Sequence, residues 1–404
     1  MNGTGPPPVP SKSSIKNWNL GIGPILSHSF NSDRTLLAVS SAEKVFVFGF
    51  ENGNWVKRTE LPQHDLSVTG LDWAPKTNRL VSSSHDKNSF VWTCGPDGVY
   101  KPELVLLRSQ YGLSCVAWSP LENKFAVGTH AKHIAVTYYE KENDWWVAKQ
   151  IKKSIQSTVL CIDWHPNNVM IAAGTTDYRV LVFSAYIKEV DEKPNANVWG
   201  SKLPFGVLLA EFNTTSWVHS VAFSPSGNLL AWSNRASELS VINKTNGENA
   251  QPVTVQHKFL PFTSLLWVDE TSFLGIGHEY SPVLFEVVNG EAVYRKKIGV
   301  PASEKESSQS SAFKMFRDIN RTAQQNNNTN NVQPNSLHQN AVKTMKIYAT
   351  NPKGVAKFST SGLDGVVAIW DLKAALQQAY ELEPGDPKLT TTDEDNSAAI
   401  CDTA

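Results

Sequence analysis

Short alternating apolar segments that end in an aromatic residue recur along the chain. Each alternates apolar and other positions, ends in Trp or Phe, and is followed in most copies by a proline turn. The five clear copies are VTGLDWAP (68–75), LSCVAWSP (113–120), VLCIDWHP (159–166), VHSVAFSP (218–225) and FTSLLWVD (262–269). A period of two is typical of a β-strand with one buried face. The pattern therefore predicts strands that recur every 44 to 46 residues, with one longer step of 59.

Each copy is followed by two further alternating segments with a polar turn between them, as in RLVSSSHDKNSFVWT (79–93). Two weaker copies, ILSHSFNSD around Phe30 and VKTMKIYAT around Ile347, bring the number of repeats to seven. Each repeat is therefore expected to form a small antiparallel sheet. A single sheet of this size cannot bury both of its faces, so the repeats are expected to stack radially.

A period of this length built from strands alone, with Trp370-Asp371 closing the last copy, is typical of WD repeats, the blades of a β-propeller. We predict an all-β fold, a seven-bladed WD-repeat β-propeller over residues 15–372, with an inserted amphipathic helix between the last two blades. Residues 15–24 are expected to supply the outer strand of the last blade. This pairing would close the ring and remove an exposed sheet edge.

Polar residues at the hairpins match a structural feature of this repeat. WD repeats join a loop His, a strand Ser or Thr, a turn Asp and a strand Trp through buried hydrogen bonds. We assign these positions to His64, Ser84, Asp86 and Trp92 in the second repeat, and to Asp364 and Trp370 in the last. The alternative of a catalytic triad lacks a nucleophile elbow or other catalytic context. We therefore expect a structural role, no enzymatic activity and no cofactor.

Several segments do not fit the repeat. Residues 1–14 are rich in Pro, Gly and Ser and are predicted to be a disordered tail. Residues 184–213 lengthen the link between the fourth and fifth repeats, and their large apolar residues Trp199 and Phe205 leave two alternatives, a loop docked on the ring or an interface. Residues 373–404 are predicted to form a short helix and a disordered C-terminal tail.

The largest departure is an insertion at residues 289–337, which ends in an Asn/Gln-rich linker. Before that linker, residues 311–323 are predicted to form a helix. Its apolar positions recur at spacings of three and four and include Phe313, Met315, Phe316 and Ile319. Two interpretations remain open. The helix folds back on the propeller wall, or it inserts its apolar side chains into a groove on another protein.

Composition narrows the function classes. Lys and Arg number 37 against 38 Asp and Glu, so no net field draws the chain to nucleic acid, and we expect no nucleic-acid partner. The sequence has no apolar run long enough to span a bilayer and no N-terminal secretory pattern, so we expect no membrane insertion and a cytoplasmic location. The four Cys residues show no zinc-binding spacing, and no metal site is expected.

Two stretches, KENDWWV (141–147) and SAYIKEV (184–190), are not general features of WD repeats. Together with WGSKLPFG (199–206), they resemble the WD-repeat subunit 1, or forty-kilodalton subunit, of the actin-related protein 2/3 complex. The resemblance covers the chain from about residue 25 to 372. The Asn/Gln-rich linker and the tail after residue 372 look longer than the family pattern.

The resemblance implies a non-catalytic scaffold subunit that supports nucleation of branched actin filaments. It implies as partners actin-related proteins 2 and 3, the small subunits of the complex, the actin filament and nucleation-promoting factors, and a location at the actin cytoskeleton, in actin patches or the cell cortex. Phe313, Phe316 and Ile319 match by position the helix that contacts the mother filament. The alternative is a WD-repeat adaptor of another complex such as a ubiquitin ligase, although no recruitment domain remains unassigned.

Overall fold

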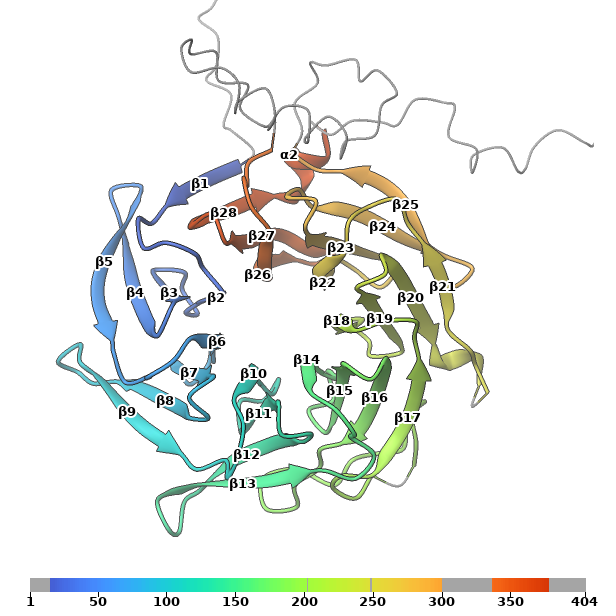
Figure 1. Cartoon of the computed structure of the whole chain (residues 1–404), viewed down its shortest axis with the longest axis horizontal. Helices are drawn as coiled ribbons and strands as arrows, with labels where there is room; N and C mark the ends of the chain where they lie inside the picture. Colours follow the sequence, from blue (N-terminus) through green and yellow to red (C-terminus); the bar gives the residue numbers. More distant parts are fainter. Residues whose placement is uncertain (1–14, 202, 248, 300–335, 378–404) are drawn as a thin grey trace, which may run out of the picture.

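Seven four-stranded antiparallel sheets stand around a central opening in the computed structural model of the chain (Figure 1). The structure describes residues 15–201, 203–247, 249–299 and 336–377. The predicted all-β, seven-bladed propeller is therefore confirmed. Within the described part of the chain, no helix is long and apolar enough to cross a lipid bilayer.

The blades follow one another around the ring in chain order. Blade 1 contains β2 (Ser27–Phe30), β3 (Leu36–Ser41), β4 (Lys44–Glu51) and β5 (Asn54–Leu61). Blade 2 contains β6 (Val68–Trp73), β7 (Arg79–Ser84), β8 (Ser89–Cys94) and β9 (Tyr100–Val105). Blade 3 contains β10 (Leu113–Trp118), β11 (Lys124–Thr129), β12 (Ile134–Glu140) and β13 (Trp145–Ile151). Blade 4 contains β14 (Val159–Trp164), β15 (Met170–Thr175), β16 (Arg179–Ser184) and β17 (Leu208–Asn213).

The remaining blades follow the same plan. Blade 5 contains β18 (Val218–Phe223), β19 (Leu229–Asn234), β20 (Glu238–Asn243) and β21 (Val253–Gln256), with the 3-10 helix η1 (Lys244–Asn246) after β20. Blade 6 contains β22 (Phe262–Trp267), β23 (Ser272–Gly277), β24 (Val283–Val288) and β25 (Glu291–Lys297). Blade 7 contains β26 (Val342–Asn351), β27 (Gly354–Gly362), β28 (Val366–Asp371) and β1 (Ile15–Asn19), and the helix α2 (Leu372–Gln377) follows β28.

The N-terminal strand closes the ring. β1 pairs antiparallel with β28, and the register runs from Ile15 opposite Trp370 to Asn19 opposite Val366. β1, at the start of the described chain, is thus the outer strand of blade 7, which also contains β28 (Figure 1). The predicted closure by residues 15–24 is confirmed. It gives β28 a partner, so blade 7 has four strands like the other blades.

The second strands of the blades are the most buried. Every residue of β11, β15 and β19 is buried, because neighbouring blades cover both faces of these strands. Apart from Lys124, which has a buried ion-pair partner, the sequences KFAVGT and MIAAGT are accordingly apolar or small and do not alternate. The hydrophobic core therefore consists of layers between the blades, and each layer joins residues of two consecutive repeats.

Side chains at the inner ends of the blades bind the backbone of the next blade. Ser29 Oγ accepts from Trp73 N at 2.9 Å, Asp72 Oδ2 accepts from Trp118 N at 2.8 Å, and Asp163 Oδ2 accepts from Phe223 N at 2.7 Å. Asp72 also accepts from Lys346 Nζ of blade 7 at 3.0 Å. These carboxylates satisfy backbone donors of neighbouring strands, which is the structural role that their place in the repeat predicts.

The structure corrects one predicted boundary. The insertion was predicted at 289–337, but residues 291–297 form β25, the outer strand of blade 6. The sequence EAVYRKK carries charges on both sides of the strand, so its alternation is weak, yet Ala292 is buried and Tyr294 packs on the blade 6 core. The insertion begins only after this strand. The predicted helix 311–323, the tail 1–14 and residues 378–404 lie outside the described residues.

Candidate interaction surface

The predicted actin-contact residues Phe313, Met315, Phe316 and Ile319 lie outside the described residues. The structure does describe both attachment points of the segment that carries them. The chain leaves the ring after β25, where Ile298 is fully buried, and it returns before β26 at Ser336–His338. Both attachment points belong to the junction between blades 6 and 7.

The returning end is held by a buried hydrogen-bond network in blade 7. His338 Nδ1 lies 3.0 Å from Asp364 Oδ2, and His338 Nε2 lies 2.8 Å from Thr360 Oγ1. The indole of Trp370 donates to the same hydroxyl at 2.8 Å. Burial opposes ionisation of Asp364, but the hydrogen bonds from His338, Gln339 N and Val366 N and the electrostatic attraction of His338 together outweigh it and lower the pKa of that carboxyl. This network contains Asp364 and Trp370, as predicted, and His338 and Thr360, which the sequence analysis missed.

The departing end touches the same tryptophan. Gly299 has a φ of +82° and lies so close to the Trp370 ring that a Cβ at this position would collide with it. Trp370 is itself fully buried. Trp370 therefore packs against Gly299 at the departing end. It also shares the hydroxyl of Thr360 with His338 at the returning end.

Blade 2 has a matching network and requires a correction. His64 Nδ1 lies 2.8 Å from Asp86 Oδ2, and His64 Nε2 lies 2.8 Å from Ser82 Oγ, which also accepts from Trp92 Nε1 at 2.9 Å. The network serine is therefore Ser82 and not the predicted Ser84.

Ser84 has a different role at the end of β7. Its hydroxyl donates to Leu66 O at 2.7 Å and accepts from Asp86 N at 3.1 Å. Ser82 and Ser84 point to the same side of the strand, so alternation alone could not separate them. The spacing could have: the hydroxyl residue stands four before the Asp and ten before the Trp in both Ser82-Asp86-Trp92 and Thr360-Asp364-Trp370.

The blade 2 network does not form a usable catalytic triad. The His64 side chain is fully buried and that of Asp86 is almost fully buried, and the hydroxyl of Ser82 is already shared between His64 and Trp92. Burial is the largest influence on His64 and lowers its pKa despite the neighbouring Asp86. No substrate can approach such a hydroxyl. Among the residues that the structure places, no three His, Cys, Asp or Glu side chains are grouped as metal ligands would be.

The long link after β16 is docked on the ring. Trp199 and Leu203 are buried in the layer between blades 4 and 5, and Phe205 packs on the layer between blades 3 and 4. Trp199 also donates its indole N–H to Gly227 O at 2.8 Å. Of the two alternatives for residues 184–213, docking on the ring therefore applies to both predicted anchor residues.

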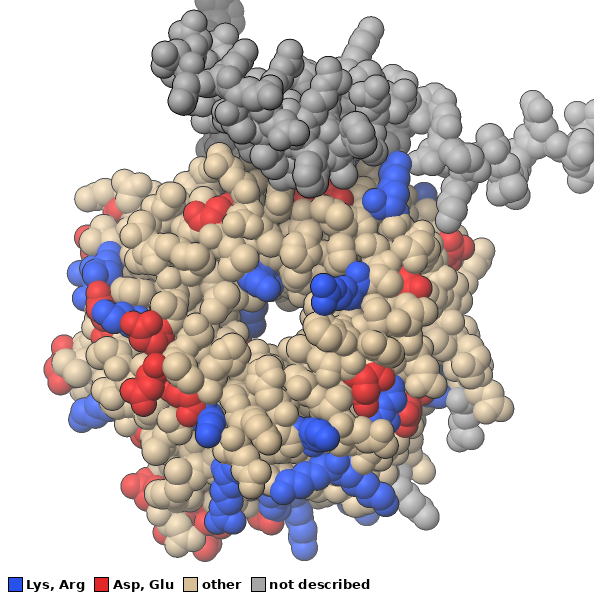
Figure 2. All heavy atoms as spheres, viewed as in Figure 1, with Lys and Arg blue, Asp and Glu red and all other residues tan. Residues whose placement is uncertain are grey.

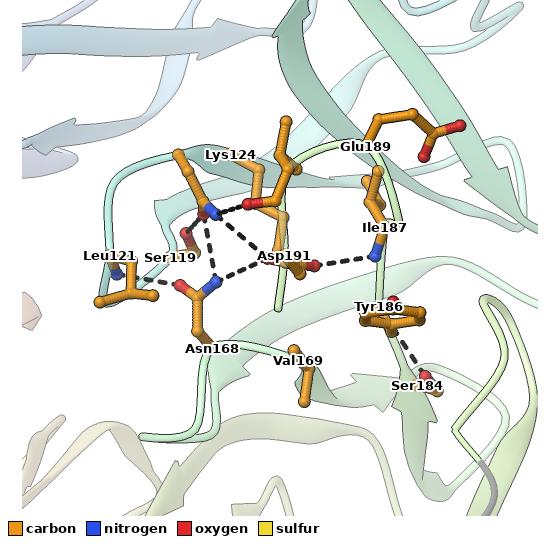
Figure 3. Close-up of polar contacts among 12 residues, drawn as sticks. Ser119, Leu121, Lys124, Asn168, Val169, Ser184, Tyr186, Ile187, Glu189 and Asp191 are labelled. Carbon is orange, nitrogen blue, oxygen red and sulfur yellow. Dashed lines mark hydrogen bonds and ion pairs between the residues drawn. The ribbon is translucent and has the colours of Figure 1, made fainter. Parts of the chain in front are cut away.

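A buried polar cluster fixes the first half of this link (Figure 3). Lys124 at the start of β11 donates to Asp191, and both side chains are almost completely buried. Asp191 also accepts from Asn168 Nδ2 at 2.9 Å, from Asn123 Nδ2 at 3.1 Å and from Ile187 N at 2.8 Å. Turns of blades 3 and 4 and the link thus share one carboxylate. The sequence analysis did not identify this cluster.

Charges are separated on the face seen in Figure 2. Lys and Arg side chains gather over β12, β13 and β14, whereas Asp and Glu side chains gather over the strands of blade 2 and its boundary with blade 1. Further Lys and Arg side chains lie beside the central opening. Surfaces of opposite sign on one rigid ring favour partners of different charge at different blades.

Comparisons with known proteins agree with this architecture. The family model for the WD domain, G-beta repeat, matches residues 55–93 and 149–184. Actin-related protein 2/3 complex subunit 1A-B of Xenopus laevis is 45% identical over 357 residues, which cover 87% of this chain and 94% of that protein. The chain belongs to the actin-related protein 2/3 complex subunit 1 family. More distant members of the subunit 1 family also match over nearly their whole length.

Actin-related protein 2/3 complex subunit 1 of Schizosaccharomyces pombe is 38% identical over 86% of this chain and 97% of that protein. Subunit 1A of Arabidopsis thaliana is 36% identical over 88% of this chain and 96% of that protein. In the structure, β13, which begins within KENDWWV, contacts the SAYIKEV segment. Lys149 of β13 donates to both carboxylate oxygens of Glu189 in the SAYIKEV segment at 2.9 Å.

Proposed function

We propose that this chain is a non-catalytic scaffold subunit of an actin-related protein 2/3 complex and supports nucleation of branched actin filaments. Its partners would be actin-related proteins 2 and 3 and the small subunits. The closed ring supports this proposal, because a rigid propeller offers several separate surfaces to neighbours while its own polar networks are buried. We place the protein in the cytoplasm at the actin cytoskeleton, in actin patches or the cell cortex.

We further propose that the segment between blades 6 and 7 contacts the mother filament through Phe313, Met315, Phe316 and Ile319. The observation that carries this proposal is the fixing of both segment ends around Trp370. A short apolar helix alone would lose much binding energy to its own ordering. Attachment at two points of a buried core reduces that loss, which suits a segment that has to find a groove on a large partner. Activating nucleation-promoting factors are expected to act on the assembled complex.

Affinity capture of the tagged chain from native lysate tests membership of the complex. The proposal expects two actin-like proteins and four small subunits to co-purify. The adaptor alternative expects a ubiquitin ligase or another assembly, and nothing in the described residues favours it. Recovery of such an assembly without actin-like proteins would contradict the proposal.

A further inference from the structure

One blade lacks the aromatic side chain that the other six share. Ile347 of β26 pairs with Phe358 in the register in which Trp73 pairs with Leu80 and Trp267 with Phe273. It is therefore the structural equivalent of the repeat aromatics. Those six residues are at most 7% exposed, whereas Ile347 is 41% exposed. The six are Phe30, Trp73, Trp118, Trp164, Phe223 and Trp267.

In two other blades this aromatic side chain reaches across to the preceding blade. Trp164 Nε1 donates to Ala117 O at 3.0 Å, and Trp267 Nε1 donates to Ala222 O at 2.9 Å. Ile347 has no indole N–H that could donate to blade 6 in the same way. A surface groove of about 450 Å³ lies here, lined by Pro225, Trp267, Val268, Ile347 and Val355 among others. We call it the 6–7 groove.

The C-terminal helix begins beside this groove. Leu372 and Ala375 of α2 are buried in the same apolar cluster as Val268 and Val355, which line the groove. α2 follows β28 but also contacts β27, so the chain turns back from the third strand of blade 7 toward the second. Figure 1 shows α2 at the junction of blades 7 and 6. The last described residues of α2 therefore lie beside the 6–7 groove.

The sequence after α2 supplies a suitable side chain. Tyr380 is the one aromatic residue among residues 378–404, and it follows Leu372 and Leu376 at spacings of eight and four. Asp269 and Glu270 line the groove together with Lys353, so the apolar ring, and not charge, is the feature that suits the groove.

We propose that the C-terminal segment, residues 378–404, covers the 6–7 groove, with the ring of Tyr380 in the place of the missing repeat aromatic. The occupant is this chain's own tail because the chain continues into it from α2, beside the groove, and because Tyr380 supplies the aromatic ring. The contact completes the junction of blades 6 and 7 from within the chain. It is independent of the proposed filament contact.

Site-specific photo-crosslinking in the purified, complete assembly tests this. Benzoyl-phenylalanine replaces Tyr380, and cross-linked peptides are identified by mass spectrometry. We expect cross-links to peptides that contain Pro225, Trp267–Glu270 or Ile347–Val355. Cross-links to another subunit, or to any other part of this chain, would overturn the proposal.

A filled groove provides the control. Ile347→Trp restores the repeat aromatic and should lower the cross-linking yield at least about tenfold, whereas Val56→Trp, at an exposed position on β5, should leave it unchanged. Hydrogen exchange gives a second measurement with no designed tryptophan. Truncation after Gln377 should speed amide exchange in Thr350–Val355, and an unchanged rate would equally overturn the proposal.

Discussion

His338 Nδ1 lies 3.0 Å from Asp364 Oδ2, and this contact joins the loop that follows the insertion to the last turn of the closing blade. This hydrogen bond thus joins His338, which lies outside the repeat, to Asp364, which belongs to the repeat of blade 7. Gly299, before the insertion, packs against Trp370 of the same blade. Stability of blade 7 and positioning of the insertion are therefore coupled.

Asp364→Ala should destabilise the fold and loosen the returning loop. The carboxylate accepts from the buried His338, from Gln339 N at 2.9 Å and from Val366 N at 3.1 Å, so its loss leaves one buried and two more accessible donors without this acceptor and costs about 2–3 kcal/mol. Asp86→Ala in blade 2 is the matched control, since it breaks the equivalent network far from the insertion. Both variants should lower the unfolding midpoint. Only Asp364→Ala should also speed amide exchange in Ser336–Gln339, and equal exchange in both variants would contradict the coupling.

Lys124→Met should be among the most destabilising single changes. It leaves Asp191 as a buried charge without its cation, which costs about 3–5 kcal/mol. Adding Asp191→Asn removes that charge while keeping an acceptor for Ile187 N, so the double variant should recover part of the loss. Urea unfolding of the four proteins in a double-mutant cycle measures the coupling.

The partly exposed ion pair between Lys149 and Glu189 serves as the control for that cycle. Lys149→Ala should cost less than about 1 kcal/mol, because solvent screens the pair. A cost for Lys124→Met as small as that for Lys149→Ala would show that the buried pair does not hold the link on the ring.

His28 should make the seam between blades 1 and 7 sensitive to acid. Its ring bonds Thr344 at 2.7 Å and Ser361 and Ser359 at 2.8 Å each, and burial, together with the positive charges of Lys346 and His338, lowers its pKa to about 3. Between pH 6.5 and 3 the unfolded chain binds this proton and the folded chain does not. Stability from this group is therefore present above pH 6.5 and falls by about 1.4 kcal/mol per pH unit below it.

His28→Gln removes this titration and should flatten the pH dependence of the unfolding free energy below pH 6.5. Asp163 acts in the opposite sense, because burial raises its pKa to about 7. Between about pH 4 and 7 the folded chain therefore binds a proton at Asp163 that the unfolded chain does not. The comparison must therefore be the difference between wild type and His28→Gln. An identical slope in both proteins between pH 6 and 4 would contradict the assignment.

Much of the fold could be predicted from local patterns. Strand alternation and the recurring aromatic are properties of six-residue segments, so β6, β10 and β14 could be recognised without knowledge of their neighbours. The closing strand β1 could be predicted because a ring of seven repeats needs one more outer strand than the last repeat contains. These features follow from the spacing of the apolar residues and from the number of repeats.

Features that depend on long-range partners were missed. Lys124 and Asp191 are 67 residues apart and carry no periodic signal, so nothing local marks them as a pair. His338 follows the Asn/Gln-rich linker, and its role appears only when β26 and β27 bring it to Thr360. Ser82 and Ser84 lie on one face of β7, so alternation does not distinguish them, whereas the spacing to Asp86 and Trp92 that blade 7 repeats does.

Binding of the assembled complex to the sides of actin filaments tests the central claim most directly. Phe316→Ala should remove one apolar anchor worth about 1.5–3 kcal/mol, which corresponds to an affinity about 10- to 100-fold lower, while the complex still purifies intact. Asp318→Ala changes a charged residue of the same predicted helix that is not among its apolar positions, and should leave binding unchanged. Branching measured by microscopy and pyrene-actin assembly should fall in parallel with binding. Normal side binding and normal branching with Phe316→Ala would contradict the account.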